Sequence, residues 1–262
     1  MQSTVLDITL QPGKKLYFAS DFHLGAPNHA DSLRRERKIV AWLDSIKTDA
    51  QAVFLVGDLF DFWFEYRRVV PRGFVRLLGK LAELSDAAVQ IFIFRGNHDM
   101  WMTNYFEQEL GVSVHRNPVE CRVRCGAETV NFHIVHGDGL GPGDYFYKVL
   151  RRVFENGLAR WCFGNLLPAD VAMWLAHAWA RNSWQSHEQQ AKPVFWGEQK
   201  EWLLLYAKEI ESQHHHDYYV FGHRHIELDH AVSAESRIFI LGDWITLWTY
   251  GVYDGAQMQL KN

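Results

Sequence analysis

The chain has 262 residues, of which 48% are hydrophobic and 22% are charged, a composition that is typical of a folded protein and excludes a disordered chain. Its formal net charge of -4 excludes a broad basic surface, so nucleic acid is not an expected partner. Three cysteines are too few for a disulfide framework, and no stretch reaches the roughly 20 apolar residues that cross a bilayer.

The first ten residues alternate polar and apolar side chains. A secretory signal peptide would instead show a basic region followed by an apolar core. Cys121 and Cys125 are spaced to share one face of a strand, where we expect them to be small, half-buried residues. These features predict a protein of the reducing cytoplasm.

From residue 15 to residue 99, short apolar runs alternate with amphipathic stretches. Strands are predicted at 16–19, 52–56 and 89–94, with helices at 32–46 and 73–84 between them. Strands that are joined by helices usually pair in parallel and are covered on both faces. The pattern therefore predicts a buried sheet flanked by helices.

After residue 112 the pattern changes to short strands, and the clearest of these are predicted at 129–135, 218–221, 237–241 and 249–254. A second sheet is needed to accommodate them. Two sheets that pack face to face, with helices outside each, predict an α/β fold that is a four-layer αββα sandwich.

Residues 139–205 interrupt this pattern and are predicted to form a helical cap inserted between the core segments 1–138 and 206–262. Apolar residues at helical spacing run from Phe146 to Cys162. Six of the 11 tryptophans also fall in the cap. The basic residues beside the apolar stripe are Lys148, Arg151, Arg152 and Arg160. The stripe fits either ordinary packing or an apolar cleft with basic residues near anionic lipid headgroups.

Five short segments carry side chains that bind metals, and each follows an apolar run. They are Asp21-Phe22-His23, Gly57-Asp58-Leu59-Phe60-Asp61, Gly96-Asn97-His98-Asp99, His136-Gly137-Asp138 and Gly222-His223-Arg224-His225. Taken singly, each segment is more often a turn or a surface histidine than a site. Loops at the carboxyl ends of parallel strands converge, however, so their shared position predicts one site.

Imidazole and carboxylate groups bind divalent ions, and a dinuclear site needs one ligand that reaches both ions. We expect Asp58 to be that bridge. The two ions would be held by Asp21, His23 and His225 and by Asn97, His136 and His223. Two such ions lower the pKa of a shared water and neutralise phosphoryl oxygens. His98 is expected to face the substrate and to act on the leaving group or the transition state.

The order of these segments resembles the calcineurin-like metallophosphoesterase superfamily, whose motifs include Asp-x-His, Gly-Asp-x-x-Asp, Gly-Asn-His-Asp and Gly-His-x-His. The match extends from Asp21 to His225. It implies a metal-dependent phosphoester hydrolase in which Asp58 bridges the ions, while Asp61 and Asp99 orient the ligands. It also implies manganese, although iron and zinc suit the same mixed nitrogen and oxygen ligands.

Local details are similar to the branch of this superfamily that cleaves UDP-2,3-diacylglucosamine into UMP and 2,3-diacylglucosamine 1-phosphate during lipid A biosynthesis. These details are the run from Gly57 to Trp63, the cap after His136, and residues 241–244. The similarity implies a glycolipid nucleotide substrate and peripheral contact with the cytoplasmic face of the inner membrane. It also implies four substrate contacts, Asp144, Tyr147, Arg181 and Ser183. One departure is His98, where proteobacterial members of the branch carry arginine.

Two alternatives stay open at this point. The first is a phosphodiesterase or phosphatase that acts on a soluble nucleotide or phosphodiester, and the second is a non-catalytic scaffold. The scaffold is disfavoured because the chain keeps all seven candidate ligands together with His98. Outside the site, His214, His215 and His216 follow an amphipathic stretch and are predicted to be a solvated surface run.

Overall fold

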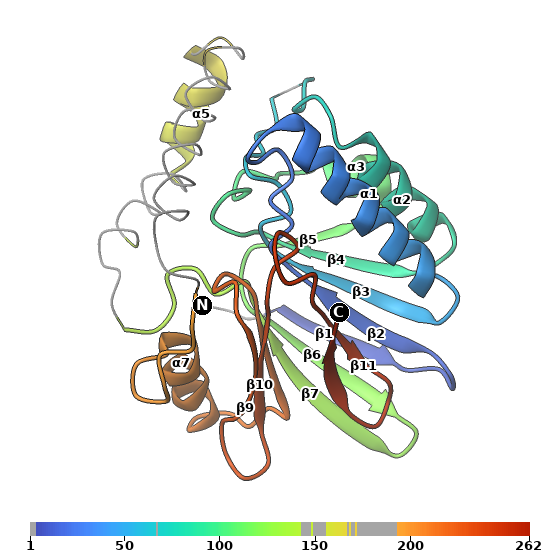
Figure 1. Cartoon of the computed structure of the whole chain (residues 1–262), viewed down its shortest axis with the longest axis vertical. Helices are drawn as coiled ribbons and strands as arrows, with labels where there is room; N and C mark the ends of the chain where they lie inside the picture. Colours follow the sequence, from blue (N-terminus) through green and yellow to red (C-terminus); the bar gives the residue numbers. More distant parts are fainter. Residues whose placement is uncertain are drawn as a thin grey trace.

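The computed structural model describes residues 4–66, 68–142, 148, 156–166, 168, 171 and 193–262. In this part of the chain two six-stranded sheets lie face to face, and helices cover their outer faces (Figure 1). The structure confirms the predicted four-layer arrangement of helices, sheet, sheet and helix.

The first sheet has the strand order β12-β11-β2-β3-β4-β5, and its neighbours β2, β3, β4 and β5 pair in parallel. The carboxyl ends of these strands therefore point to one edge. Its strands are β2 (Lys15–Ala19), β3 (Ala50–Val56), β4 (Gln90–Phe94), β5 (Ser113–His115), β11 (Tyr250–Tyr253) and β12 (Met258–Lys261).

The second sheet has the order β1-β6-β7-β8-β10-β9, and β7, β8 and β10 are parallel neighbours. Its strands are β1 (Thr4–Thr9), β6 (Val119–Cys125), β7 (Glu128–Ile134), β8 (Tyr218–Phe221), β9 (Glu227–Ala231) and β10 (Arg237–Leu241). Both sheets thus contribute parallel strands, and this arrangement allows loops from each of them to form one site.

The space between the sheets is filled by apolar side chains that alternate along the strands. Phe18 of β2 stacks on Phe54 of β3 at 4.8 Å between ring centroids and on Phe132 of β7 at 5.7 Å, so this contact joins the two sheets. Tyr17 and Ala19 point to the opposite face, into the core beneath the helices. This dense packing fixes the position of the strand ends.

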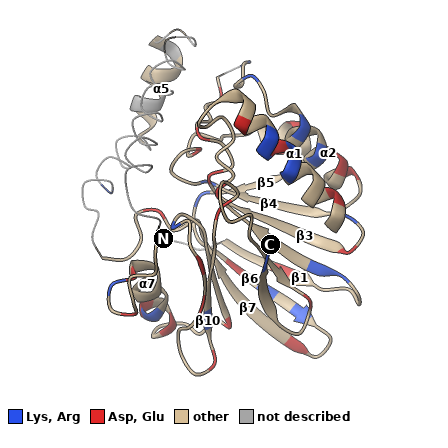
Figure 2. Cartoon of the chain, viewed as in Figure 1, with Lys and Arg blue, Asp and Glu red and all other residues tan. Residues whose placement is uncertain are grey.

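Helices α1 (His29–Ile46), α2 (Val75–Asp86) and α3 (Tyr105–Leu110) cover the first sheet, and α7 (Trp202–Glu211) covers the second (Figure 1). A further helix, α5 (Gly157–Leu166), lies apart from both sheets. Lys and Arg are interspersed with Asp and Glu over α1 and α2 (Figure 2). None of the helices in the described ranges is long and apolar enough to cross a membrane.

The predicted strands and helices agree with the structure to within a few residues, but four elements were missed: β1, β9, β12 and α3. Helix α7 crosses the boundary predicted at residue 205, because Leu203 and Leu204 are buried against the second sheet. The division into a core and a 139–205 cap stays a prediction. His216 corrects the predicted surface run, since its side chain is buried while His214 and His215 are exposed.

Candidate metal centre

The five metal-binding segments all lie at carboxyl ends of strands, on the edge shared by the two sheets. Three of them follow β2, β3 and β4 of the first sheet, and two follow β7 and β8 of the second. The candidate ligands that these loops bring together are Asp21, His23, Asp58, Asn97, His136, His223 and His225. The parallel topology therefore gathers residues that are far apart in the sequence.

The backbone at this edge adopts conformations that side chains normally avoid. Eight residues other than glycine have a positive φ in the described part of the chain, and five of them are candidate ligands: Asp21, His23, Asp58, His223 and His225. Each such residue costs of order 1–3 kcal/mol unless its surroundings hold it. Neighbouring glycines make room, since a Cβ atom at residue 222 would lie 2.6 Å from Oδ2 of Asp21.

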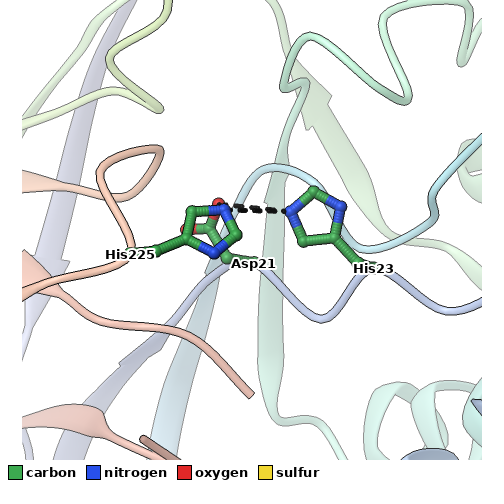
Figure 3. A group of neighbouring side chains, drawn as sticks. All are labelled: Asp21, His23 and His225. Carbon is green, nitrogen blue, oxygen red and sulfur yellow. Dashed lines mark hydrogen bonds and ion pairs between the residues drawn. The ribbon is translucent and has the colours of Figure 1, made fainter. Parts of the chain in front are cut away.

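The first group of side chains consists of Asp21, His23 and His225, which point toward one another (Figure 3). The Nε2 atoms of His23 and His225 lie 3.2 Å apart, and Oδ1 of Asp21 is 3.6 Å and 3.2 Å from them, respectively. This oxygen is buried and accepts no hydrogen bond from another described residue. Three donor atoms that converge in this way fit one divalent cation.

The second group consists of Asp58, His136 and His223, with Asn97 beside them. Nδ1 of His136 lies 2.8 Å from the carbonyl oxygen of Val56, and because a carbonyl only accepts, this nitrogen carries the proton. The Nε2 lone pair is then directed at Oδ2 of Asp58, 3.2 Å away. A lone pair facing a carboxylate oxygen needs either a second proton or a metal cation between the two atoms, so this group also fits a metal.

Asp58 lies between the two groups. Its Oδ2 is 3.2 Å from Nε2 of His136 and 3.7 Å from Nε2 of His23, so one carboxylate oxygen faces both. Burial disfavours its charge, but His136 and His98 hold the pKa of this carboxyl well below its usual range. An ionised, buried carboxylate in this position has the geometry that a bridging ligand needs.

A match to a protein-family model identifies the class of protein to which this chain belongs. The family model described as calcineurin-like phosphoesterase matches residues 14–227. The chain belongs to the calcineurin-like phosphoesterase family. Members of this family are metal-dependent hydrolases, so the chain is a hydrolase and the donor groups described above indicate divalent metal binding.

Relatives within the calcineurin-like phosphoesterases carry a more specific name. The chain is 40% identical over 259 residues to "UDP-2,3-diacylglucosamine hydrolase" of Porphyromonas gingivalis, an alignment that covers 95% of this chain and 97% of the relative. It is 28% identical to a hydrolase of the same name from Shewanella baltica, with 87% and 88% covered. A solved dimetal phosphatase from Danio rerio aligns over 96% of each chain with 14% identity and a TM-score of 0.43.

Carboxylates behind the candidate ligands hold them in place. Asp99 accepts hydrogen bonds from the backbone N–H groups of Gly96 and Leu59, both at 2.8 Å, and so ties two of the family's motifs together. Burial and the nearby charge of Asp58 raise the pKa of Asp99 to about 6. Asp61 lies 3.8 Å from Nδ1 of His23 and 3.4 Å from Nδ1 of His98, so it contacts both rings.

His98 lies beside the candidate ligands. Its ring is 4.7 Å from the ring of His23, edge to face, and its backbone N–H donates to Oδ1 of Asp58 at 2.9 Å. Nδ1 lies 3.1 Å from the carbonyl oxygen of Asp61 and so carries a proton. Although burial opposes it, the charge of Asp58 and the hydrogen bond to Asp61 raise the pKa of His98 to about 9.

Two residues at the site had no role in the sequence-based assignment. Asp243 faces His225, with Oδ2 3.6 Å from Nδ1, and its other oxygen accepts backbone hydrogen bonds from Ile245, Thr246 and Leu247. The run 241–244 had been noted as a family similarity, which could have identified it. Arg224 was passed over as the variable residue of Gly-His-x-His.

The Arg224 side chain is buried and connects the ligand loop to the segment before α7. Its guanidinium pairs with Glu201 at 2.9 Å, donates to the carbonyl oxygen of Val194 at 3.1 Å and stacks on Trp196 and Trp202. Residues 194–202 are therefore attached to the loop that carries His223 and His225. No short motif predicts this contact, because it depends on tertiary packing.

The predicted substrate contacts Asp144, Tyr147, Arg181 and Ser183 lie outside the described residues. Their roles stay predictions. The individual metal and catalytic roles of the other site residues also stay predictions, although the structure brings those side chains together at one edge.

Proposed function

We propose that this hydrolase cleaves UDP-2,3-diacylglucosamine into UMP and 2,3-diacylglucosamine 1-phosphate, a step of lipid A biosynthesis. The observation that carries the proposal is the 40% identity, over 95% of the chain, to the Porphyromonas gingivalis hydrolase of that name. The similarity spans nearly all of both chains, so it includes the cap as well as the metal motifs.

We propose that two divalent ions bind, one at Asp21, His23 and His225 and one at Asn97, His136 and His223, with Asp58 reaching both. Such ions supply charge neutralisation at the phosphoryl oxygens and a water whose pKa lies near neutrality. Manganese is the proposed ion, and iron and zinc suit the same nitrogen and oxygen donors.

His98 is proposed to act on the diphosphate itself. The hydrogen bond from its Nδ1 to Asp61 leaves Nε2 as the nitrogen available to the substrate. A protonated Nε2–H can donate to a phosphoryl oxygen or to the leaving oxygen, and either contact strengthens as negative charge builds up there. The candidate ligand His23 is more deeply buried than His98, with 3% of its side chain exposed against 19% for His98.

An apolar surface beside the metal centre supports a lipid substrate. Phe64 and Trp101 lie a few residues after two of the ligand motifs, and Phe163 of α5 packs on both, at 4.9 Å and 4.8 Å between ring centroids. Helix α5, which falls within the predicted cap, thereby contacts side chains close to the site. Its Leu158 and Trp161 are exposed to 70% and 53%.

Exposed apolar residues are concentrated between residues 158 and 196 of the sequence. Of the ten large hydrophobic residues that are exposed in the described ranges, seven are Leu158, Trp161, Leu166, Val171, Val194, Phe195 and Trp196. Exposed apolar side chains on this scale suit contact with a lipid or another partner. We propose that they receive the two acyl chains and rest on the cytoplasmic face of the inner membrane.

The proposal is tested by comparing substrates. Purified protein with manganese is assayed on UDP-2,3-diacylglucosamine, on UDP-N-acetylglucosamine and on bis(p-nitrophenyl) phosphate, with UMP or nitrophenol as the product. We expect kcat/KM to be at least about 100-fold higher for the acylated substrate, because both chains bury apolar surface on binding. Equal or faster turnover of the substrates without acyl chains contradicts the lipid assignment.

A double variant and a matched control test the apolar surface itself. Leu158→Ala combined with Trp161→Ala should raise KM for the acylated substrate and leave turnover of bis(p-nitrophenyl) phosphate unchanged. Val75→Ala is the matched control, because Val75 is 71% exposed but lies on α2. The same KM for all three proteins would remove α5 from the substrate site.

A further inference from the structure

A second group of histidine and carboxylate side chains lies outside the metal centre. Glu120 of β6 and His133 of β7 are cross-strand partners, and His216 lies just before β8. Their donor atoms all lie within 4.8 Å of one another. The group faces α7, on the opposite side of the sheet from the neighbouring Ile134, which packs between the sheets.

The three side chains converge through defined atoms. Nδ1 of His133 is 2.9 Å from Oε1 of Glu120, and Nε2 of His216 forms a short contact with the other oxygen, Oε2. Both histidines are buried, and the Glu120 side chain is 21% exposed. Solvent therefore reaches the group from the side of Glu120.

Hydrogen bonds indicate which ring nitrogen of neutral His216 carries the proton and which one faces Glu120 without a proton. The Tyr219 hydroxyl donates its single proton to Oε2 of Glu211, at 2.7 Å. The same hydroxyl lies 3.3 Å from Nδ1 of His216, so it must accept there and Nδ1 must carry a proton. Nε2 of neutral His216 then directs a lone pair at the Glu120 carboxylate. Such a contact needs either a second proton or a metal cation between the two atoms.

The surrounding groups match those found around metal-bound histidines. Nε2 of His133 lies 3.2 Å from the Tyr206 hydroxyl, and Nδ1 of His216 donates to Tyr219, so each ring is held by a hydroxyl on its far nitrogen.

We propose that Glu120, His133 and His216 form a separate zinc site. Two imidazoles and one carboxylate are a common zinc ligand set, with a fourth position left for water, and here the partly exposed side of Glu120 provides that position. The ion would link β6, β7 and the start of β8. Because β7 and β8 lead directly into His136 and His223, the site braces the strands that carry the metal centre.

Metal analysis tests the proposal on the full chain. The protein is loaded with zinc, desalted and measured by inductively coupled plasma mass spectrometry. Glu120→Gln should bind one zinc ion fewer per chain than the parent, whereas His215→Ala should bind the same number, because His215 is exposed and pairs with Glu211 instead. The Tm of the parent should rise with zinc by a few degrees more than that of Glu120→Gln.

Crystals of the zinc-loaded parent provide a second measurement that needs no variant. Anomalous diffraction at the zinc edge should give a peak between the three side chains, distinct from any peak at Asp58. Equal zinc content in the parent and Glu120→Gln, or no peak at this position, overturns the proposal and leaves a proton-bridged ion-pair network. Neither readout depends on turnover, so this proposal can fail while the proposed hydrolase function holds.

Discussion

Strands β7 and β8 adjoin two groups of histidine and carboxylate side chains, the metal centre and an outer group of Glu120, His133 and His216, and the two groups differ in how the backbone presents them. At the metal centre the residues lie in loops beyond the strand ends, and Asp58, His223 and His225 have positive φ values. In the outer group, Glu120 and His133 sit in regular antiparallel pairing. Residue type alone therefore does not distinguish the two groups, whereas backbone conformation does.

The difference has a physical cause. Left-handed conformations are unfavourable for residues with a side chain and persist only where the surrounding packing enforces them, which is why they concentrate at functional sites. The pleat of a strand presents side chains without such strain. We therefore expect changes at the strand ends to affect catalysis, and changes in the outer group to affect stability and zinc content.

The largest effect is expected for Asp58→Ala, because the Asp58 carboxylate faces both ligand groups. Its removal should abolish binding of both ions and lower kcat/KM by at least about 1,000-fold. Metal content and hydrolysis are measured on the same preparation. Glu120→Gln is the matched carboxylate variant in the outer group and should keep full turnover. Full activity in Asp58→Ala would contradict the proposed role of the metal centre.

His98→Ala should separate catalysis from metal binding. Nδ1 of the ring donates to the carbonyl oxygen of Asp61, and Nε2 is proposed to contact the substrate and is not a proposed metal ligand. We expect the metal content to stay at the parental level while kcat falls by roughly 100- to 10,000-fold, the range for loss of an acid–base group. His23→Ala, which removes a proposed ligand, is the contrasting variant. Equal metal loss in the two would show that His98 acts as a ligand.

Much of the metal centre could be predicted from the sequence because the residues that form it lie in short segments next to strand ends. Each ligand lies within four residues of the end of the strand that precedes it, and a glycine accompanies most of them, as Gly96 does for Asn97. The alternation of strands and helices then implies parallel pairing, which brings the loops together. The seven candidate ligands and the four-layer fold followed from these two kinds of signal.

Other features could not be predicted, because they depend on contacts between distant segments. The buried position of His216 arises from its contact with Glu120, 96 residues away, whereas the sequence shows only a run of three histidines. The Arg224 contact with Glu201 is likewise set by how α7 packs on the second sheet. Strands β1 and β9 were missed because most of their side chains are exposed or only partly buried: β1 has one buried side chain and β9 has none.

Gly96→Ala tests how tightly the strand-end loops are packed. A Cβ atom at residue 96 would lie 2.6 Å from the backbone nitrogen of Asp58 and would also collide with its carboxylate. Displacement of Asp58 should reduce both metal affinity and kcat/KM, the latter by about 100-fold. Gly79→Ala is the control, because no atom lies within 4 Å of its Cβ position in α2. It should keep activity and gain up to about 1 kcal/mol in the free energy of unfolding.

The smallest effect on activity is expected for Tyr206→Phe, which alters the outer group alone. Loss of the hydroxyl leaves Nε2 of buried His133 without its 3.2 Å partner, at a cost of about 1–3 kcal/mol in the free energy of unfolding. Urea denaturation should show this loss, while kcat/KM stays at the parental value. Tyr105→Phe serves as the control, because its hydroxyl makes no hydrogen bond to another described residue. A fall in kcat/KM for Tyr206→Phe beyond that of the control would show that the two groups are coupled through β7 and α7.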